Sequence, residues 1–187
     1  MAKIGLRNFY YSVATVNSTT GILTYSGATK PGKAVSFNFD PTVSNAELYA
    51  DDALAESDTS VNGGSCTMGI DRYDLATAAA LLGHTESGDV VTSNVDDVAP
   101  YVGLGRIVTI MQDGALKYRA VFFPKVKFQE GSSSDTTKGQ TTEFGTYELT
   151  GTVSATASGD WRKEKVFDTQ SAADSWLQSL MTGQSSN

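Results

Sequence analysis

Cysteine and histidine are almost absent from this chain of 187 residues, which contains only Cys66 and His84. A single cysteine cannot form an internal disulfide, and we expect Cys66 to be a small buried side chain. No apolar run approaches the ~18 residues of a membrane-spanning helix, so we expect no membrane association. His84 follows Leu82-Gly83, where a helix is expected to end, and a hydrogen-bond donor or cation is favourable there.

Basic residues are nearly absent between Asp40 and Asp74. Arg72 is the only base in this stretch, which carries the whole formal net charge of −7. The acids in it are Asp40, Glu47, Asp51, Asp52, Glu56, Asp58, Asp71 and Asp74. Proteins that bind duplex DNA present a basic stripe, whereas a surface rich in acids repels nucleic acid. We therefore expect no tight binding of DNA.

Catalytic patterns are also lacking. No serine is flanked by the glycines of a nucleophile elbow. Asp51 and Asp52 are adjacent, and neighbouring carboxylates on a strand point to opposite faces, where they rarely cooperate in acid–base chemistry. The stretch Gly103-Leu104-Gly105 lacks the third glycine and the helix of a phosphate-binding loop. We therefore expect no enzymatic activity and no cofactor.

A calcium-stabilised loop remains an alternative, because carboxylates are hard oxygen ligands. The acids that would supply them are Asp51, Asp52, Glu56 and Asp58. The spacing of an EF-hand is missing, so the expected metal set is none.

Strand patterns dominate what is present. Residues 35–40 and 146–155 alternate between apolar and polar side chains, and 107–111 is β-branched and apolar on both faces, as in a central strand. In the following segment one side carries Leu116, Tyr118, Ala120, Phe122, Val126 and Phe128. The other side is expected to carry Lys117, Arg119, Lys125 and Lys127. Pro124 within this run requires an edge position or a bulge.

Two helices are expected, over residues 71–82 and 171–182. Each has apolar residues on one face and is followed by a glycine, Gly83 or Gly183. The acidic stretch 51–64 ends in Asn62-Gly63-Gly64 and is expected to be a long loop. The composition predicts one domain over residues 1–187, with an N-terminal arm (about 1–16) and a C-terminal helix and tail (about 169–187).

Five segments resemble one known family. They are residues 4–11 (IGLRNFYY), 46–52 (AELYADD), 99–105 (APYVGLG), 118–128 (around PKVKF) and 147–152 (YELTGT). In order and spacing they are similar to the major tail proteins of long-tailed, non-contractile bacteriophages of Gram-positive hosts. The resemblance extends over nearly the whole chain.

That resemblance implies a mainly β fold, a tail-tube-type β-sandwich with a flanking α-helix and a second short C-terminal helix. It implies a structural virion protein made in the host cytoplasm. Such proteins form hexameric rings that stack into a tube, through which DNA passes during ejection. The implied partners are further copies of the chain, the tape measure protein, and the tail terminator and distal tail proteins.

The residues give this role a physical basis. A conduit must not bind its cargo, and nucleic-acid affinity comes mainly from neutralised phosphates. Candidate inter-subunit or lumen residues are the acids Asp51, Asp52, Glu56 and Asp58 and the bases Lys117, Arg119, Lys125 and Lys127. Two arrangements stay open. The basic strand face meets the acidic loop of an adjacent subunit, or the acids line the channel and the bases are solvated.

Two other functions fit the same sequence. An extracellular carbohydrate-binding β-sandwich is one, since exposed aromatic rings stack on sugars. The aromatics available for this are Tyr10, Tyr11, Tyr25, Trp161 and Trp176. The tube of a contractile tail-like particle is the other, because the same core fold recurs there.

Overall fold

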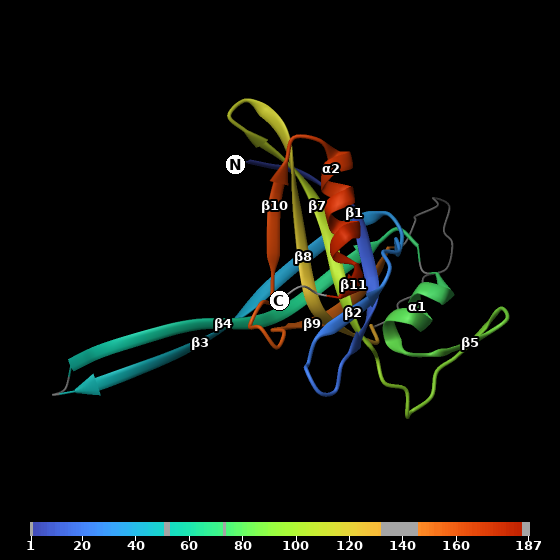
Figure 1. The fold of residues 1–187 in the computed structure, drawn as a ribbon, viewed down its shortest axis with the longest axis horizontal. Coiled ribbons are helices and arrows are strands. Elements are labelled where there is room, and N and C mark those ends of the chain that lie inside the picture. Colours follow the sequence, from blue (N-terminus) through green and yellow to red (C-terminus); the bar gives the residue numbers. More distant parts are fainter. Residues whose placement is uncertain (1, 51–52, 73, 132–145, 185–187) are drawn as a thin grey trace, which may run out of the picture.

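The computed structural model describes residues 2–50, 53–72, 74–131 and 146–184, with the backbone alone for 45–50, 53–58 and 184. Strands dominate this part of the chain (Figure 1). The elements are β1 (Ala2–Val16), β2 (Leu23–Ser26), β3 (Ala34–Ala50), β4 (Ala53–Ile70), α1 (Leu75–Leu82), β5 (Thr85–Ser87), β6 (Val90–Thr92), β7 (Tyr101–Gln112), β8 (Ala115–Gln129), β9 (Tyr147–Ser154), β10 (Lys163–Phe167), α2 (Gln170–Leu180) and β11 (Thr182–Gln184). The predicted mainly β fold with a flanking helix and a C-terminal helix is confirmed. Among the residues described, no helix is long and apolar enough to cross a membrane.

One antiparallel sheet organises the described residues. Its strand order is β11-β2-β1-β7-β8-β9-β4-β3, and β10 pairs with β8 beside this path, while β5 and β6 form a separate hairpin. Phe9 on β1 packs against Phe37 on β3 with ring centroids 5.9 Å apart, although these strands are not neighbours. Phe39 on β3 likewise lies 5.2 Å from Phe123 on β8. The sheet therefore curves over itself and encloses a core between two layers.

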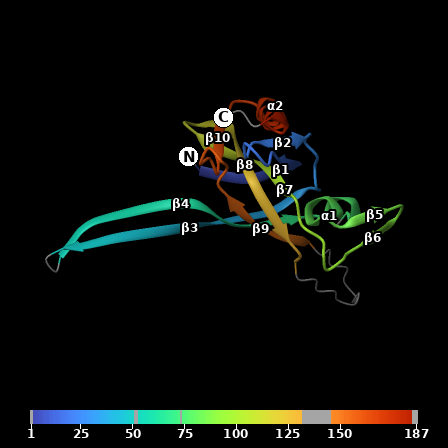
Figure 2. The same ribbon diagram turned by 60° about the horizontal axis from the view of Figure 1, so that its bottom comes forward.

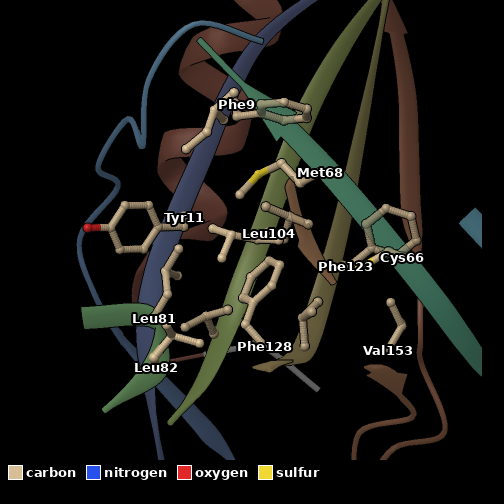
Figure 3. Close-up of a cluster of buried hydrophobic side chains, with 14 of the residues drawn as sticks. Phe9, Tyr11, Cys66, Met68, Leu81, Leu82, Leu104, Phe123, Phe128 and Val153 are labelled. Atoms are coloured by element: carbon tan, nitrogen blue, oxygen red, sulfur yellow. The ribbon is translucent and has the colours of Figure 1, made fainter. Parts of the chain in front are cut away.

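Two apolar clusters stabilise this arrangement. The first lies between the layers and contains Phe9, Met68, Leu104 and Phe123 (Figure 3). The second lies on the outer face of β1, β7 and β8, where Leu177 and other apolar residues of α2 cover the sheet. Figure 2 shows α2 on one side of these strands and β3, β4 and β9 on the other. The curved sheet is thus buried on both faces where β7 runs through it.

A β-bulge at Pro124 divides β8 into two halves. Leu104 pairs with Phe123 and Val102 pairs with Val126, so β8 uses one residue more than β7 over this interval. The predicted irregularity at Pro124 is confirmed. Before the bulge β8 pairs with β10, and after it β8 pairs with β9.

The bulge shifts the alternation of side chains along β8. Before the bulge, the odd-numbered residues Val121 and Phe123 lie in the inter-layer core. After it, the even-numbered residues Val126 and Phe128 lie in the same core. The prediction that Lys117, Arg119, Lys125 and Lys127 share one face is therefore wrong. Lys117 and Arg119 lie on the inter-layer face, and Lys125 and Lys127 lie on the opposite one, because one extra residue reverses a period of two.

The segment expected to be an acidic loop, residues 51–64, is instead part of a long hairpin. Apart from residues 51–52, which lie outside the described ranges, it belongs to β4 and pairs with β3. A bulge lies at its root, since Pro41 pairs with Gly64 but Val43 pairs with Val61. Pairing of β4 with β9 ends at Gly63. Beyond that point β3 and β4 project from the body as a two-stranded ribbon (Figure 1).

Residues 2–16 of the predicted N-terminal arm (about 1–16) form β1, a strand of the main sheet. From Ala2 to Ala14, β1 pairs with the central strand β7, and near its end it pairs with β2 as well. Phe9 is fully buried in the inter-layer core. An apolar, strand-like sequence at a chain terminus is equally suited to an arm or an interior strand, and here tertiary burial decides for the strand.

The flanking helix α1 begins at Leu75, whereas the sequence predicts a start at Asp71. The backbone N–H of Lys33 donates to Asp71 Oδ1 at 2.7 Å, and this contact ties Asp71 to the start of β3. Asp74 has an extended backbone at the N-cap. Gly83 ends the helix in the left-handed conformation with φ 79°, as predicted.

The C-terminal helix α2 differs little from expectation. It begins after Thr169, whose Oγ1 accepts a hydrogen bond from the backbone N–H of Ala172 at 3.3 Å. It ends at Leu180, and residues 182–184 then pair with β2 as β11. The predicted tail is therefore fixed to the sheet through residue 184, and residues 185–187 lie outside the description.

Gly64 at the root of the hairpin has no room for a side chain. A Cβ there would collide with the carbonyl oxygen of Asp40 and lie 2.9 Å from Pro41 Cα. We expect Gly64→Ala to lower the free energy of unfolding by about 1–3 kcal/mol, as overpacking does. The matched control is Gly5→Ala on β1, where a Cβ meets nothing within 4 Å. Equal losses for both variants in urea denaturation would contradict this reading.

Candidate assembly surfaces

The ribbon formed by residues 43–61, named here the acidic hairpin, combines charge with exposed backbone. It contains five acids and no base: Glu47, Asp51, Asp52, Glu56 and Asp58. Glu56 pairs with Leu48 and Asp58 pairs with Ala46 along the ladder, whereas Asp51 and Asp52 lie outside the described residues. In the described ranges no third strand accompanies the ribbon. A two-stranded ribbon is marginally stable in water and its edges offer unpaired N–H and C=O groups, so a partner is favoured.

The first basic pair of β8, Lys117 and Arg119, already has partners within the chain. Lys117 Nζ lies 3.2 Å from Asp168 Oδ1. Arg119 Nε lies 3.5 Å from Glu164 Oε2. Both acids come from the segment around β10, which pairs with this half of β8. These two bases therefore face acids of the same chain, although Arg119 shares Glu164 with Arg162.

The second basic pair, Lys125 and Lys127, lies on the other face of the sheet. Their ammonium groups lie 4.6 Å and 5.7 Å from the ring centroid of Tyr101. Neither lysine has an ion-pair partner among the residues that the structure describes. The aromatic ring holds two adjacent cations that can accept acids from elsewhere.

Arg106 is a charged residue that the sequence reasoning missed. It is the only charged residue of β7, and its guanidinium lies 4.3 Å from the ring centroid of Phe37. Burial first, and then the nearby charge of Arg119, lower the pKa of Arg106 to about 10. An arginine inside an otherwise apolar central strand was the available signal. Its neighbours Arg162 and Glu164 come from a segment distant in sequence, which the strand pattern did not connect to it.

Polar contacts fix α2 to β1. Asn8 Nδ2 and Tyr10 Oη both donate hydrogen bonds to Asp174 Oδ1, at 3.1 Å and 2.8 Å. Burial, then the hydrogen bond to Asp174, raises the pKa of Tyr10 to about 12. Arg7 Nη1 donates to Gln170 at 3.2 Å. The helix is therefore positioned by specific contacts as well as by its apolar face.

His84 joins two acids from different parts of the chain. Its Nδ1 lies 2.8 Å from Asp97 Oδ2 and its Nε2 lies 3.1 Å from Glu130 Oε2. Asp97 Oδ2 also accepts a hydrogen bond from the backbone N–H of Asn94 at 2.8 Å. The expectation that His84 serves only the end of the helix therefore misses its main role, which is to clamp the 94–97 turn to the end of β8.

Within the described residues, no group of three or more His, Cys, Asp or Glu side chains is placed to hold a metal ion. The calcium alternative depends on Asp51, Asp52, Glu56 and Asp58, whose side chains lie outside the description. Gly103 and Gly105 belong to β7 and serve packing: a Cβ on Gly105 would lie 2.8 Å from Met181 Cε. Gly105 therefore lets α2 approach the sheet closely, whereas a Cβ on Gly103 would lie 2.8 Å from the ring of Tyr25.

The His84 clamp predicts a specific pH dependence. The hydrogen bond to Asp97, opposed by burial and aided by Glu130, raises the pKa of His84. Its contribution to stability is fully present below the unfolded value of about 6.5 and is lost as pH rises through the raised folded value. The pKa of Asp97 is lowered, first by the Asn94 N–H and then by His84, so its contribution is lost only in acid.

We therefore expect His84→Gln to lower the free energy of unfolding more near about pH 5.5 than near about pH 8.5. Urea denaturation of both proteins across this range measures the difference. Asp97→Asn should reduce the pH dependence of wild-type stability. Its neighbour Asp96→Asn is the matched control and should preserve it, and a flat difference between wild type and His84→Gln would contradict the clamp.

No model of a known protein family matches the chain, and none of the curated proteins matches it either. Function therefore has to be inferred from the geometry and from the residue patterns.

Proposed function

We propose that this chain is the major tail protein of a long-tailed bacteriophage, a subunit that assembles with copies of itself into stacked rings forming the tail tube. The observation that carries the proposal is the acidic hairpin. It leaves the body at the Gly63-Gly64 bulge and extends as a ribbon with no accompanying strand in the described ranges. Such a ribbon gains stability when a neighbour pairs with its edges or covers its face.

The resemblance of five segments to major tail proteins also supports the proposal, and four of these segments lie outside the hairpin. One of these segments, residues 46–52, contributes to the acidic hairpin itself, and another, 118–128, spans the bulge of β8. Hexameric rings, the tape measure, terminator and distal tail partners, and the location in the virion all follow from that resemblance.

Charge complementarity indicates how copies would meet. The acidic hairpin carries five acids without a base, and Lys125 and Lys127 form the basic pair that lacks an ion-pair partner among the described residues. Lys117 and Arg119 are engaged with Asp168 and Glu164 instead. We therefore assign the receiving face to Lys125 and Lys127. A donor surface and a different acceptor surface make a heterologous contact, which closes into a ring or continues as an open stack according to the rotation between copies.

The acids also suit a conduit for DNA. A subunit with net charge −7, repeated around and along a tube, gives a field that repels phosphates. Acids lining the channel and acids meeting a neighbour are the two arrangements that the experiment below separates. The same reasoning applies to the tube of a contractile particle, which remains a variant of the proposal.

The carbohydrate-binding alternative is weakened because three of its five aromatics are buried, while Trp161 and Trp176 are half-buried and packed on other rings. Tyr10, Tyr11 and Tyr25 retain only 4%, 6% and 5% of their accessible surface. Trp161 stacks against Phe39 with ring centroids 5.5 Å apart. Rings packed in this way do not form a platform for a sugar.

Reversing two charges of the acidic hairpin tests the proposal. We expect Glu56→Lys/Asp58→Lys to slow assembly at low salt about tenfold or more, because complementary charges mainly set association rates. Light scattering measures the rate and negative-stain electron microscopy identifies the product. Adding Lys125→Glu/Lys127→Glu to this variant should restore assembly in part.

The matched control is Glu86→Lys/Asp89→Lys, the same change of charge on the small β5–β6 hairpin, and it should assemble like wild type. Intact tubes from the acidic-hairpin variant, combined with slower DNA passage, would place its acids in the channel and remove the contact with Lys125 and Lys127. Uniform monomers from wild type at all concentrations would contradict the tail-tube proposal itself.

A further inference from the structure

Two arginines contact one glutamate at the edge of the inter-layer core, and a third arginine lies nearby. Arg119 lies on β8, Arg162 directly precedes β10, and Glu164 lies on β10. Glu164 Oε1 lies 2.6 Å from Arg162 Nε, and Glu164 Oε2 lies 3.5 Å from Arg119 Nε. Arg106 on β7 is close enough for the charges of Arg119, Arg162 and Glu164 all to act on it. We name these four residues the arginine cluster.

The arginine cluster is not neutral. Three positive charges and one negative charge leave a net charge of +2 in a protein whose overall charge is −7. Both oxygens of Glu164 are already directed at Arg119 and Arg162, which leaves Arg106 without a carboxylate of its own. Like charges held close together repel one another, most strongly around the partly buried Arg106, so this arrangement favours an additional anion.

Hydrogen bonding in the cluster is also incomplete. The Nε atoms of Arg106 and Arg119 are shielded from solvent and have no hydrogen-bond partner. Arg119 Nε lies 3.5 Å from Glu164 Oε2, which makes an ion pair but not a hydrogen bond. A shielded donor on a charged group that lacks an acceptor is unfavourable. The cluster therefore lacks both negative charge and acceptor oxygens.

Aromatic rings hold two of the guanidinium groups in place. Arg106 lies over Phe37, 4.3 Å from the ring centroid, and Arg162 lies over Trp161 at 4.6 Å. Trp161 in turn stacks on Phe39. A guanidinium that is packed through its face presents its N–H donors at its edge, the geometry that binds oxyanions through paired hydrogen bonds.

We propose that the arginine cluster is a binding site for a doubly charged oxyanion, inorganic phosphate or sulfate. One dianion balances the net charge of +2, whereas a monocarboxylate leaves half of it. Its several oxygens supply the acceptors that Arg106 and Arg119 lack. The site does not depend on the proposed tail function. Of its four residues, only Arg119 was among the predicted inter-subunit or lumen residues.

Thermal unfolding and calorimetric titration of the full chain test the site. We expect sulfate and phosphate to give a saturable rise in Tm that chloride does not give at the same ionic strength. Sulfate also stabilises folded proteins in general by exclusion from their surfaces, so the variants decide the matter. Arg162→Gln should weaken the apparent affinity for sulfate about tenfold, the worth of one charge-assisted hydrogen bond.

Arg106→Met keeps an unbranched side chain on Phe37 and should abolish saturable binding. Where that variant fails to fold, Arg162→Gln decides, because Arg162 is 39% exposed and its loss leaves the core intact. The matched control Lys127→Gln removes one positive charge from the opposite face and should bind sulfate like wild type. The proposal is overturned by an equal weakening in Lys127→Gln, by a wild-type shift no larger than that of chloride, or by acetate binding as tightly as sulfate.

Discussion

The bulge at Pro124 is the constraint on which the rest of the structure depends. It allows one strand to serve two partners in succession, β10 before it and β9 after it, while both halves supply side chains to the same core. Without the extra residue, either Phe123 or Phe128 would leave the core. The bulge lies where the sheet passes from its β1–β7 part to its β9–β4–β3 part. Curvature of the sheet, closure of the core and the placement of the bases on two faces all follow from it.

Periodicity predicted the elements well and their spatial partners poorly. The strands at 35–40, 107–111 and 147–154, the end of α1 at Gly83 and the amphipathic α2 were all readable from local patterns. The two faces of β8 were not, because a bulge changes parity while leaving the composition of the strand unchanged. Pro124 indicated that a bulge was possible but not how many residues it would add.

The acidic hairpin shows a second limit of the local pattern. Asn62-Gly63-Gly64 reads as a turn, and acids at high density read as a solvated loop. In the structure the same segment lies at a bulge in the pairing of β4 with β3. Position 63 requires glycine because a Cβ there would collide with the carbonyl oxygen of Val153 on β9. That requirement is a tertiary one, between strands far apart in sequence. The arginine cluster was missed for a related reason: its members come from three segments that only the pairing of β8 with β7 and β10 brings together.

The division of charge follows from the same topology. Bases on the inter-layer face of β8 lie beside β10 and face Glu164 and Asp168. Bases beyond the bulge lie on the face with Tyr101 and have no ion-pair partner in the part of the chain that the structure describes. The acids that would match them are on the acidic hairpin, which points away from the body (Figure 1). A single subunit therefore separates complementary charges that it cannot bring together by itself. Under the tail-tube proposal, a second copy joins these charges by offering its own Lys125 and Lys127 to the hairpin of the first, and a heterologous contact of this kind closes into a ring or extends as a stack. On that proposal, the topology that leaves the charges of one chain apart is the topology that favours assembly.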